Sequence, residues 1–356
     1  MKLEKMIILA FIIPISLIPL IASNRYIINV LDIIFIFIIY ASAWNFFAYA
    51  GQASLGHAVF LGVGAYASML LAGRMGFPPL ITIIFGGITS TLMGLIVGLT
   101  CIRLREWFLS MVTFGFSVIV EVVVSNPLSW LTNGRYGLWA PRLIPSKIPN
   151  YYIYEYYIIS SITIITTIVL YLLQKSKFGL ALSAIRENET AAKATGVHAT
   201  KYKLLALLVS SFFSGLAGAL LAHAVWGGYV SPEIFSIHYS FNPIIYSVSG
   251  GLGTLEGPII GTFLIIAIWE GLRFVGTYQR FIIIGAILIT TVIFIPEGIA
   301  PAIKKHIKTL AGPPGFEPGT SGSEGRCSIQ AELRALNKIH KTINIYSCNS
   351  ARSKNK

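Results

Sequence analysis

The feature that most constrains this chain is a series of apolar stretches, each long enough to cross a membrane as a helix. The hydrocarbon core of a bilayer is about 30 Å thick, so a spanning helix needs about 17–25 mostly apolar residues. The composition agrees, because 55% of the 356 residues are hydrophobic, only 12% are charged and the mean hydropathy is +0.73. The sequence therefore predicts an all-α integral membrane protein, a polytopic bundle of about 8–10 transmembrane helices.

The apolar windows fall within residues 1–303, which form the predicted membrane-spanning domain. The first window, 6–22, has no convincing cleavage site for a secretory signal, so we interpret it as a retained helix. The region 241–269 is apolar but interrupted by glycines, which predicts either an eighth crossing or a broken, re-entrant segment. The other expected spans are 27–49, 54–72, 80–101, 107–125, 152–173, 204–226 and 281–295.

The distribution of Lys and Arg predicts how the spans are oriented. With the N-terminus in the cytoplasm, the inward-facing segments as far as residue 203 hold ten basic residues and the outward-facing ones hold five. Positive charge is favoured on the cytoplasmic side, so the loop 174–203 is expected in the cytoplasm of a multi-pass protein of the plasma membrane. After residue 240 the count is ambiguous, and a re-entrant 241–269 would place the C-terminal tail in the cytoplasm as well.

The loop 174–203 is the one long charged segment between apolar spans. Residues 179–195 contain no proline and are rich in alanine, a composition that favours a helix, and Gly196 stands where a C-terminal stop is expected. The residues alone leave two interpretations equally open. The segment either displays a short helix to a soluble partner, or it is a solvated loop that only sets the topology.

Polar side chains within the spans are candidates for a translocation pathway. Asn45, Gln52 and His57 are costly to place in lipid, so we expect them to face the bundle interior or a water path. A metal at His57 is not expected, because no second His, Cys or acidic residue stands at ligand spacing. The many small residues of 51–67 and 210–219 are expected mainly to let helices pack closely.

Glu121 is an acidic residue within an expected span. An intramembrane acid suggests a proton relay or a cation site. Glu121 also lies only a turn from the polar segment that follows Ser125, where it could instead reach interfacial water. Glu270 raises the same question beside Trp269.

Residues 249–258 form a glycine-rich motif that contains Gly250, Gly251 and Gly253. The motif lacks the Lys-Ser/Thr that completes a phosphate-binding loop, and flexible backbone in an apolar region fits a broken helix that lines a pathway. No motif for nucleophilic, acid–base or metal-dependent catalysis occurs. A membrane-embedded transferase would need an Asp-rich metal motif, and Asp32 is the only aspartate. The sequence therefore predicts no enzymatic activity, no catalytic residue and no cofactor.

Four blocks of the sequence carry a resemblance through their order and spacing. They are Trp44-Asn45 with Ala50-Gly-Gln-Ala-Ser-Leu-Gly-His57; Leu131-Thr-Asn-Gly134; Ile185-Arg-Glu-Asn-Glu189 leading to Gly196; and Gly250-Gly-Leu-Gly-Thr254 with Gly257-Pro258. Over about residues 30–300 the chain resembles the permeases of branched-chain amino acid ATP-binding-cassette (ABC) transporters, the LivM-type subunit. It departs from that family at Asn133, where a glycine is usual, and at Glu297, where a basic residue is usual.

The resemblance implies a role for the loop 174–203. In that family the third block is a cytoplasmic coupling helix that fits a cleft on the ATP-hydrolysing subunit, and Glu189, Ala192 and Gly196 fall on its E-x-A-A-x-x-x-G pattern. This favours the docking interpretation over the solvated loop. The residues assigned to the coupling helix are Gly179, Ile185, Arg186, Glu187, Asn188, Glu189, Ala192 and Gly196.

The function implied by the resemblance is that of a permease subunit of an ABC importer, working by alternating access. The implied partners are a second related permease, two ATP-binding subunits, an extracytoplasmic substrate-binding protein and membrane lipid, with no nucleic acid. The implied substrates are leucine, isoleucine and valine, although related permeases carry urea, short amides or other amino acids. An alternative of another class is an ion-coupled secondary transporter, which would use Glu121 or His57 and need no ATPase.

The tail, 304–356, is a different kind of sequence. Its ten Lys or Arg residues and three acidic residues give a net charge of +7, about half of the +13 of the whole chain. The stretch 312–326 is rich in Gly, Pro, Ser and Glu, which predicts disorder. Gly315-Phe-Glu-Pro318 matches what the T-arm of a tRNA gene would encode, so we hypothesise that the frame runs into a tRNA-like gene and that 311–356 has no evolved function. Contact of a basic tail with anionic lipid is the rival interpretation.

Overall fold

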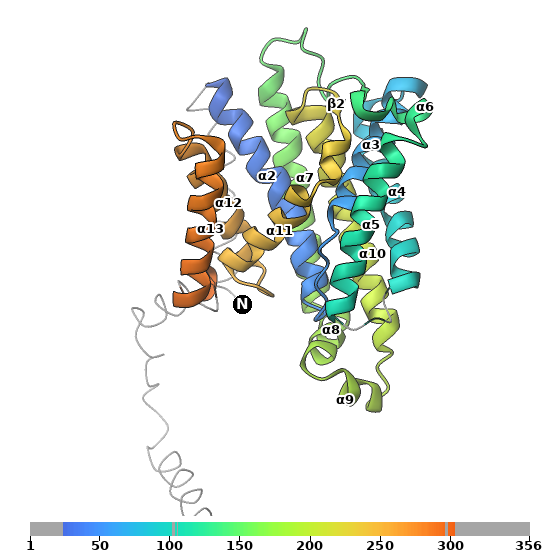
Figure 1. Cartoon of the computed structure of the whole chain (residues 1–356), viewed down its shortest axis with the longest axis vertical. Coiled ribbons are helices and arrows are strands. Elements are labelled where there is room, and N and C mark those ends of the chain that lie inside the picture. The colour runs from blue at the N-terminus through green and yellow to red at the C-terminus, as the bar shows by residue number, and fades with distance from the viewer. Residues whose placement is uncertain (1–23, 102–103, 105, 296–297, 303–356) are drawn as a thin grey trace, which may run out of the picture. The chain divides into compact units, whose positions relative to one another are not determined.

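Six long apolar helices form the body of the structure, a computed structural model that describes residues 24–101, 104, 106–295 and 298–302 (Figure 1). Each of the six is long and apolar enough to cross a membrane. They are α2 (Arg25–Ala48), α3 (Ala58–Met75), α4 (Pro79–Cys101), α5 (Glu106–Ser125), α7 (Tyr151–Lys175) and α10 (Ala199–Leu220). They match the expected spans from 27–49 to 204–226, so the predicted all-α membrane bundle is confirmed. The expected span 6–22, Glu297 and the tail 304–356 lie outside the described residues.

The helix α2 lies in the core of the bundle. It begins after Asn24, whose side chain accepts a hydrogen bond of 3.0 Å from the backbone N–H of Tyr26 and so caps the first turn. From residue 34 to residue 48 every side chain of α2 is buried, and Tyr40 and Phe47 are completely enclosed. A helix that is apolar on all sides lies in a protein core or in lipid, and the burial of α2 shows that other helices surround it. The helices packed around α2 are α7, α10, α11 (Ile237–Gly250) and α12 (Glu256–Gly271).

The helices α3, α4 and α10 pack against one another through small residues. A Cβ atom added at Gly64 would lie 2.4 Å from the Cα atom of Gly215, and one at Gly218 would lie 1.9 Å from the carbonyl oxygen of Leu61. No residue larger than glycine fits at these crossings. The small residues of these spans therefore allow the close helix packing that the sequence predicts.

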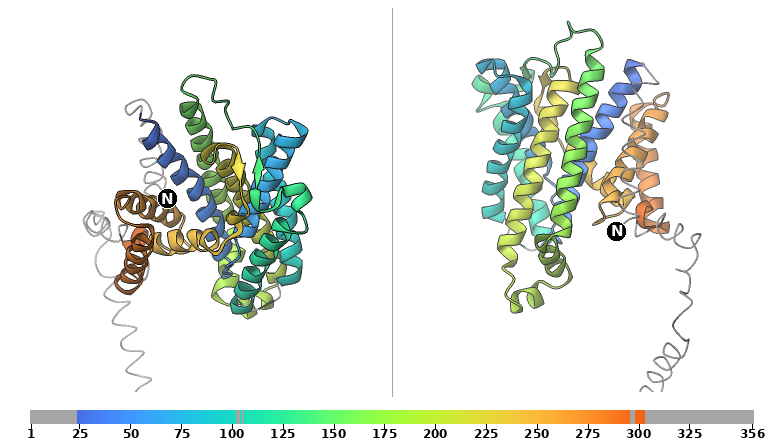
Figure 2. Two further views of the ribbon diagram at one scale, coloured as in Figure 1. Left: turned by 45° about the horizontal axis from the view of Figure 1, so that its top comes forward. Right: turned by 180° about the vertical axis from the view of Figure 1, so that it is seen from behind.

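The two ends of the bundle carry different short elements (Figures 1 and 2). At one end Leu138 pairs with Val230 and Trp139 with Tyr229, and these pairs form a two-stranded antiparallel sheet. At the opposite end a helical segment protrudes beyond the spans. The elements of the first end are α6 (Ser129–Thr132), η1 (Gly134–Tyr136), β1 (Leu138–Trp139), β2 (Tyr229–Val230) and η3 (Pro232–Phe235), and those of the second are α8 (Lys177–Glu187) and α9 (Glu189–Ala194).

Asn133 follows α6 in the left-handed region of backbone space, with φ of 61°. This conformation is strained for most side chains, but glycine adopts it freely and asparagine adopts it more readily than other residues. The departure from the usual glycine at this position therefore keeps the turn that the backbone requires.

The region 241–269 is not a single crossing. The structure divides it into α11 and α12, which pack against each other and are joined by the turn 251–255. Helix α12 starts near Asn45 and ends near Tyr26, so it runs antiparallel to α2 along most of its length (Figure 2). Helix α13 (Thr277–Phe294) then returns, because a Cβ atom added at Gly298 would lie 2.3 Å from the Cα atom of Gly251.

This path settles on which side of the bundle the last described residues lie. Residues 298–302 are at the end that also carries α8 and α9, which agrees with the expectation that the tail lies on the same side as the loop 174–203. The reason differs from the expected one, because α12 leads away from this end and α13 returns to it. The break predicted by the glycines is present at residues 251–255.

Candidate functional site

The segment assigned to coupling forms a small knob of two helices at one end of the bundle (Figure 1). The sequence predicts one helix over 179–195, and this prediction is wrong, because the backbone is extended at Asn188 with φ of −158° and ψ of 103°. The side chain of Asn188 accepts a hydrogen bond of 3.0 Å from the backbone N–H of Ala191. Asparagine competes with helical hydrogen bonding in this way, so it ends α8 and caps α9.

Two glycines shape the knob for different reasons. Gly196 has φ of +89° and no neighbour within 4 Å of an added Cβ atom, so its role is the left-handed turn after α9 that helices commonly use to end. Gly179 is helical, and a Cβ atom there would lie 1.9 Å from the carbonyl oxygen of Gln174. The first glycine ends α9 as the sequence predicts, and the second lets α8 fold back tightly on the end of α7.

Glu189 fixes the knob to the start of α10. Its carboxylate accepts hydrogen bonds from Lys193 Nζ at 2.8 Å and from Lys203 Nζ at 2.6 Å. These two ammonium groups lower the pKa of Glu189 below its ordinary value, because they stabilise the charged carboxylate. Beneath the pair, Ile185 and Ala192 are buried together. Ile185, Glu189 and Ala192 thus hold the knob in shape rather than form its outer surface.

The outer surface of the knob is small and polar. It consists of the exposed residues Glu187, Asn188, Thr190, Ala191, Lys193, Ala194, Thr195 and Gly196. Short side chains on a protruding turn leave the backbone accessible, and this suits insertion into a cleft of a soluble partner. Of the residues assigned to coupling, Glu187, Asn188 and Gly196 belong to this exposed surface.

Arg186 points from the knob toward the membrane helices. Its guanidinium carbon lies 4.9 Å from the centre of the Tyr49 ring, a cation–π contact with the end of α2. A Cβ atom added at Gly253 would lie 2.9 Å from Arg186 Nη1, and one at Gly51 would lie 3.3 Å from Arg186 Cα. The knob therefore touches both α2 and the turn 251–255 through one side chain.

The turn 251–255, which we call the glycine turn, is held by hydrogen bonds from two membrane helices. Asn45 donates to the carbonyl oxygen of Thr254 at 2.7 Å and accepts from the backbone N–H of Gly253 at 2.9 Å. Gln174, near the end of α7, donates to the carbonyl oxygen of Gly253 at 3.2 Å. Gly250 packs so tightly that a Cβ atom there would lie 1.8 Å from the carbonyl oxygen of Gly257. Asn45, Gly250, Gly251 and Gly253 are thus brought together in one structural unit.

Gln52 and His57 lie in the bundle interior. Both are buried, and His57 Nε2 lies 2.9 Å from the hydroxyl of Ser210, which in turn donates to the carbonyl oxygen of Ala43 at 2.6 Å. Neither His57 Nδ1 nor Gln52 Oε1 has a hydrogen-bond partner within the described part of the chain. No group of three potential metal ligands occurs among the described residues. A role of Gln52 and His57 in a translocation pathway stays a prediction.

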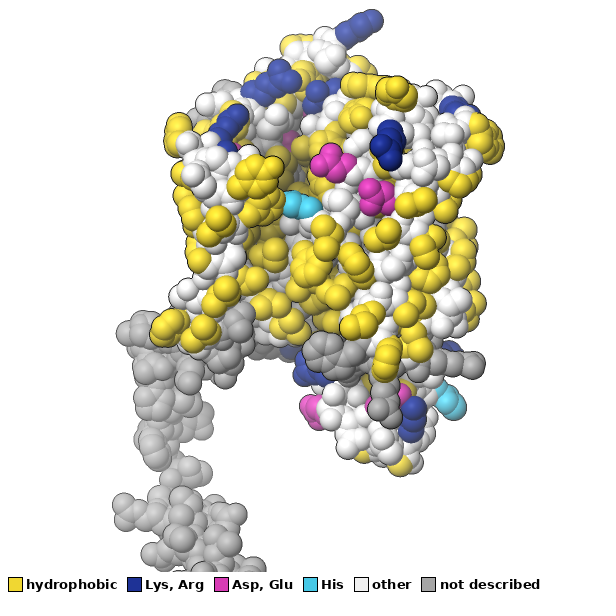
Figure 3. Space-filling view, in the orientation of Figure 1, with side chains coloured by type: hydrophobic (Ala, Val, Ile, Leu, Met, Phe, Trp, Pro, Cys, Tyr) yellow, Lys and Arg dark blue, Asp and Glu magenta, His cyan; other side chains and the backbone are white. Residues whose placement is uncertain are grey.

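Glu121 lies at the end of the bundle opposite the knob. It lines an open pocket of about 460 Å³ together with Arg135, Tyr229 and Glu233. These four residues lie on α5, η1, β2 and η3. Figure 3 shows acidic and basic side chains gathered near this end, above a broad band of apolar side chains. Glu121 is therefore separated from Asn45, Gln52 and His57 and reaches the polar end of the bundle.

Sequence reasoning missed Tyr49, Gln174 and Lys203 as parts of this arrangement. Gln174 acts on a carbonyl 79 residues away, and no local pattern reports such a contact. In the sequence, Lys203 entered only the count of positive charges that predicts orientation. The one signal that Lys203 has a specific partner was an acidic residue in the same loop. Tyr49 stands beside the first block, but its ring contact with Arg186 depends on the fold.

The chain belongs to the family described as branched-chain amino acid transport system / permease component, whose model matches residues 26–292. Members of this family are permeases of ABC transporters and not enzymes, and the protein is a multi-pass protein of the plasma membrane.

Several known proteins are similar to this chain over most of its length. The high-affinity branched-chain amino acid transport system permease proteins LivM of Salmonella typhimurium and Escherichia coli are 27% and 26% identical over 288 residues, 74% of this chain and 67% of each relative. The probable LivM permease of Methanocaldococcus jannaschii is 22% identical over 279 residues, 69% of this chain and 79% of that protein. A nucleoside permease and a ribose import permease match shorter stretches, of 226 and 127 residues. No solved structure matches the chain.

Proposed function

We propose that this protein is the permease subunit of an ABC importer that carries leucine, isoleucine and valine across the plasma membrane by alternating access. In this proposal a second related permease completes the pathway, two ATPase subunits drive it, and an extracytoplasmic binding protein delivers the substrate. The membership of the permease family and the similarity to LivM proteins support the assignment. The observation that carries it is the knob formed by α8 and α9 together with its connection to the glycine turn.

The contacts of the knob suggest how ATP hydrolysis would reach the membrane helices. A partner that pushes on the exposed residues around Asn188 and Gly196 displaces α8, and Arg186 moves with it. Arg186 contacts Tyr49 at the end of α2 and lies beside Gly253. Asn45 joins the same glycine turn to the core of α2. A displacement of the knob is therefore passed on to α2, α11 and α12 together.

Other cargoes and another class of transporter are less well supported. Nucleoside and ribose permeases are among the more distant relatives, and urea, amides or other amino acids would use the same machinery. An ion-coupled transporter would need Glu121 or His57 in a continuous ion path. Glu121 lies in the pocket at the far end, whereas His57 is enclosed and paired with Ser210, so the two do not form one site.

The proposal is tested by ATP hydrolysis of the complex that this permease forms with the neighbouring ATPases, the partner permease and the binding protein. Leucine, isoleucine, valine, glutamate, urea and ribose are titrated in turn. We expect only the three branched-chain amino acids to stimulate hydrolysis. Stimulation by another solute alone would keep the importer and change its cargo. If no ATPase co-purifies with the permease, the importer assignment is wrong.

The coupling role of the knob is tested by two matched glycine variants. Gly196 and Gly76 both have positive φ, +89° and +70°, and neither has a neighbour within 4 Å of an added Cβ atom. Gly76 ends α3 at the opposite end of the bundle, so Gly76→Lys controls for backbone strain and for added charge. We expect Gly196→Lys to stop uptake while ATP hydrolysis continues and the complex melts at the same temperature as Gly76→Lys. Equal uptake by Gly196→Lys and Gly76→Lys would remove the coupling role.

A further inference from the structure

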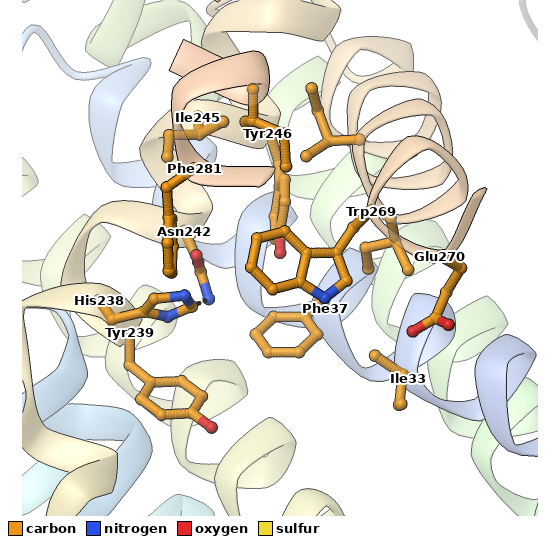
Figure 4. Close-up of a pocket in the computed structure, with 13 residues that line it drawn as sticks. Ile33, Phe37, His238, Tyr239, Asn242, Ile245, Tyr246, Trp269, Glu270 and Phe281 are labelled. Carbon is orange, nitrogen blue, oxygen red and sulfur yellow. Dashed lines mark hydrogen bonds between the residues drawn. The ribbon is translucent and has the colours of Figure 1, made fainter. Parts of the chain in front are cut away.

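A cavity lies between four helices, away from both the knob and the pocket at Glu121. It has a volume of about 210 Å³, is lined by α2, α11, α12 and α13, and is partly open to the surface (Figure 4). Its wall is predominantly apolar and includes Ile33, Phe37, Ile245, Ile265, Ile266 and Ile284. An apolar cavity of about 150 Å³ is large enough for benzene, so this one has room for a branched aliphatic side chain and part of an amino acid backbone.

Polar groups without partners face this apolar space. Within the part of the chain that the structure describes, neither the indole N–H of Trp269 nor the hydroxyl of Tyr246 has a hydrogen-bond partner. Figure 4 shows the Trp269 nitrogen and the Tyr246 hydroxyl between the Asn242 amide on one side and the Glu270 carboxylate on the other. A few polar groups converging on an apolar pocket are the usual signature of a small-molecule site.

Glu270 is the charged group of this cavity. The hydroxyl of Tyr26 donates a hydrogen bond to its Oε2 atom, and the guanidinium of Arg273 lies 4.8 Å from the centre of the Tyr26 ring. These contacts fix the carboxylate at the end of α12 and leave Oε1 without a partner among the described residues. A carboxylate beside an apolar cavity raises the free energy of the protein unless a cation or a water molecule interacts with it.

We propose that this cavity is a transit site for the amino acid substrate. Resting on the proposed function, the inference assigns the ammonium group of the substrate to Glu270 and its carboxylate to the indole N–H of Trp269. The branched side chain then lies against the isoleucine wall of the cavity. A sugar does not fit this chemistry, because its hydroxyl groups would lose water against isoleucine side chains that offer no hydrogen bonds. A lipid chain would make no use of the carboxylate.

The test uses the complete importer in liposomes, with leucine and phenylalanine as the transported probes. Ile284→Trp fills the cavity, since Ile284 lines it and is only 7% exposed. Ile282→Trp is the matched control, because Ile282 lies on the same helix and is 71% exposed. We expect Ile284→Trp to lower leucine uptake at least about tenfold, the effect of removing one good contact in a hydrophobic pocket, and Ile282→Trp to leave it unchanged.

Two further variants keep the test decisive if Ile284→Trp fails to assemble. Ile266→Ala enlarges the cavity and is expected to raise the ratio of phenylalanine to leucine uptake roughly tenfold. Glu270→Gln keeps the shape and is expected to raise the KM for leucine while the maximal rate stays near that of the wild type. Leucine-to-phenylalanine ratios and KM values equal to those of the wild type in both variants would overturn the transit site. If the wild-type importer carries none of the branched-chain amino acids, the proposed function fails instead.

Discussion

The two ends of the hairpin formed by α11 and α12 are built from different interactions. At the glycine turn, Asn45 and Gln174 bind the backbone with hydrogen bonds of 2.7–3.2 Å, and the two helices touch at Gly250 and Gly257. Toward the other end, the same hairpin lines a cavity of about 210 Å³. There the groups of Tyr246 and Trp269 have no hydrogen-bond partner among the described residues.

The difference assigns separate tasks to the two ends. A fully satisfied polar network in a low-dielectric interior is rigid, so the glycine turn is suited to pass on a displacement from the knob. An apolar cavity with unused polar groups is suited to take up and release an occupant. One hairpin thus connects the coupling segment with the candidate transit site, and the predictions below ask whether its two ends respond differently.

The largest expected effect comes from filling the tight end of the hairpin. Gly250→Val places a side chain where a single Cβ atom would already lie 1.8 Å from the carbonyl oxygen of Gly257. Backbone atoms yield little, so we expect a loss of about 3 kcal/mol in stability and little assembled importer. The control is Gly285→Val in α13, where nothing lies within 4 Å of the added atom. The measurement is the melting temperature and yield of the purified complex, and equal values for both variants would show that the turn is not tightly packed.

The next comparison uses two asparagines of the hairpin region. Asn45→Ala removes both hydrogen bonds to the glycine turn and leaves the backbone groups of Gly253 and Thr254 unpaired, which is expected to cost about 2 kcal/mol. Asn242 makes one contact, of 3.3 Å to the ring of His238, so Asn242→Ala is expected to cost less than about 1 kcal/mol. Thermal melting of the two variants measures the difference. The reverse order would mean that the turn is not the rigid end.

A third comparison concerns the contact between the knob and α2. Arg186→Ala removes a cation–π interaction that is worth about 0.5–1 kcal/mol at an exposed site. We expect ATP hydrolysis to continue while the amount of leucine carried per ATP falls about two- to fivefold, because the knob then moves without the turn. Lys177→Ala is the control, since Lys177 is an exposed cation at the start of α8 and is not part of the outer surface of the knob. An unchanged amount of leucine per ATP in Arg186→Ala would show that the knob acts on the membrane helices through other contacts.

Hydropathy was enough to locate the six long helices of the described chain, because crossing a bilayer fixes both length and composition. Hydropathy did not determine how the segments after residue 240 cross the membrane. Arg273 and Arg280 confused the count of positive charges, and the structure shows why. Arg280 donates to the carbonyl oxygens of Val275 and Arg273, and Arg273 lies over Tyr26. These two cations serve local contacts, so they carry little information on orientation.

The candidate site could be predicted only where one short stretch supplies it. The knob is local, and the sequence located it, although Asn188 divides the expected helix. Asn45 was recognised as a polar residue that must face the interior, but its partners are 208 and 209 residues away. The cavity combines side chains from four helices, so no spacing in the sequence marks it. Glu270 was noted as an unexplained acid beside Trp269, and only the fold places it against Tyr26 at the edge of the cavity.

The smallest expected effect is a pH dependence confined to the knob. Lys193 and Lys203 lower the pKa of Glu189 below its ordinary value of 4.5. A lowered pKa in the folded state means that the ion pairs stabilise the knob above the unfolded pKa, and that this stabilisation is lost as the pH falls through the folded pKa. The effect is small because the carboxylate is partly exposed to water.

Glu189→Gln isolates this contribution. Between about pH 6 and pH 3 the melting temperature of the wild-type complex should fall slightly more than that of Glu189→Gln, because only the wild type loses the pairs on acidification. Glu187→Gln is the control, since Glu187 is exposed on the same knob and should follow the wild-type profile. A Glu189→Gln profile parallel to that of the wild type would mean that Lys193 and Lys203 do not hold the knob through this carboxylate. The buried contact of Ile185 with Ala192 would then remain as its main anchor.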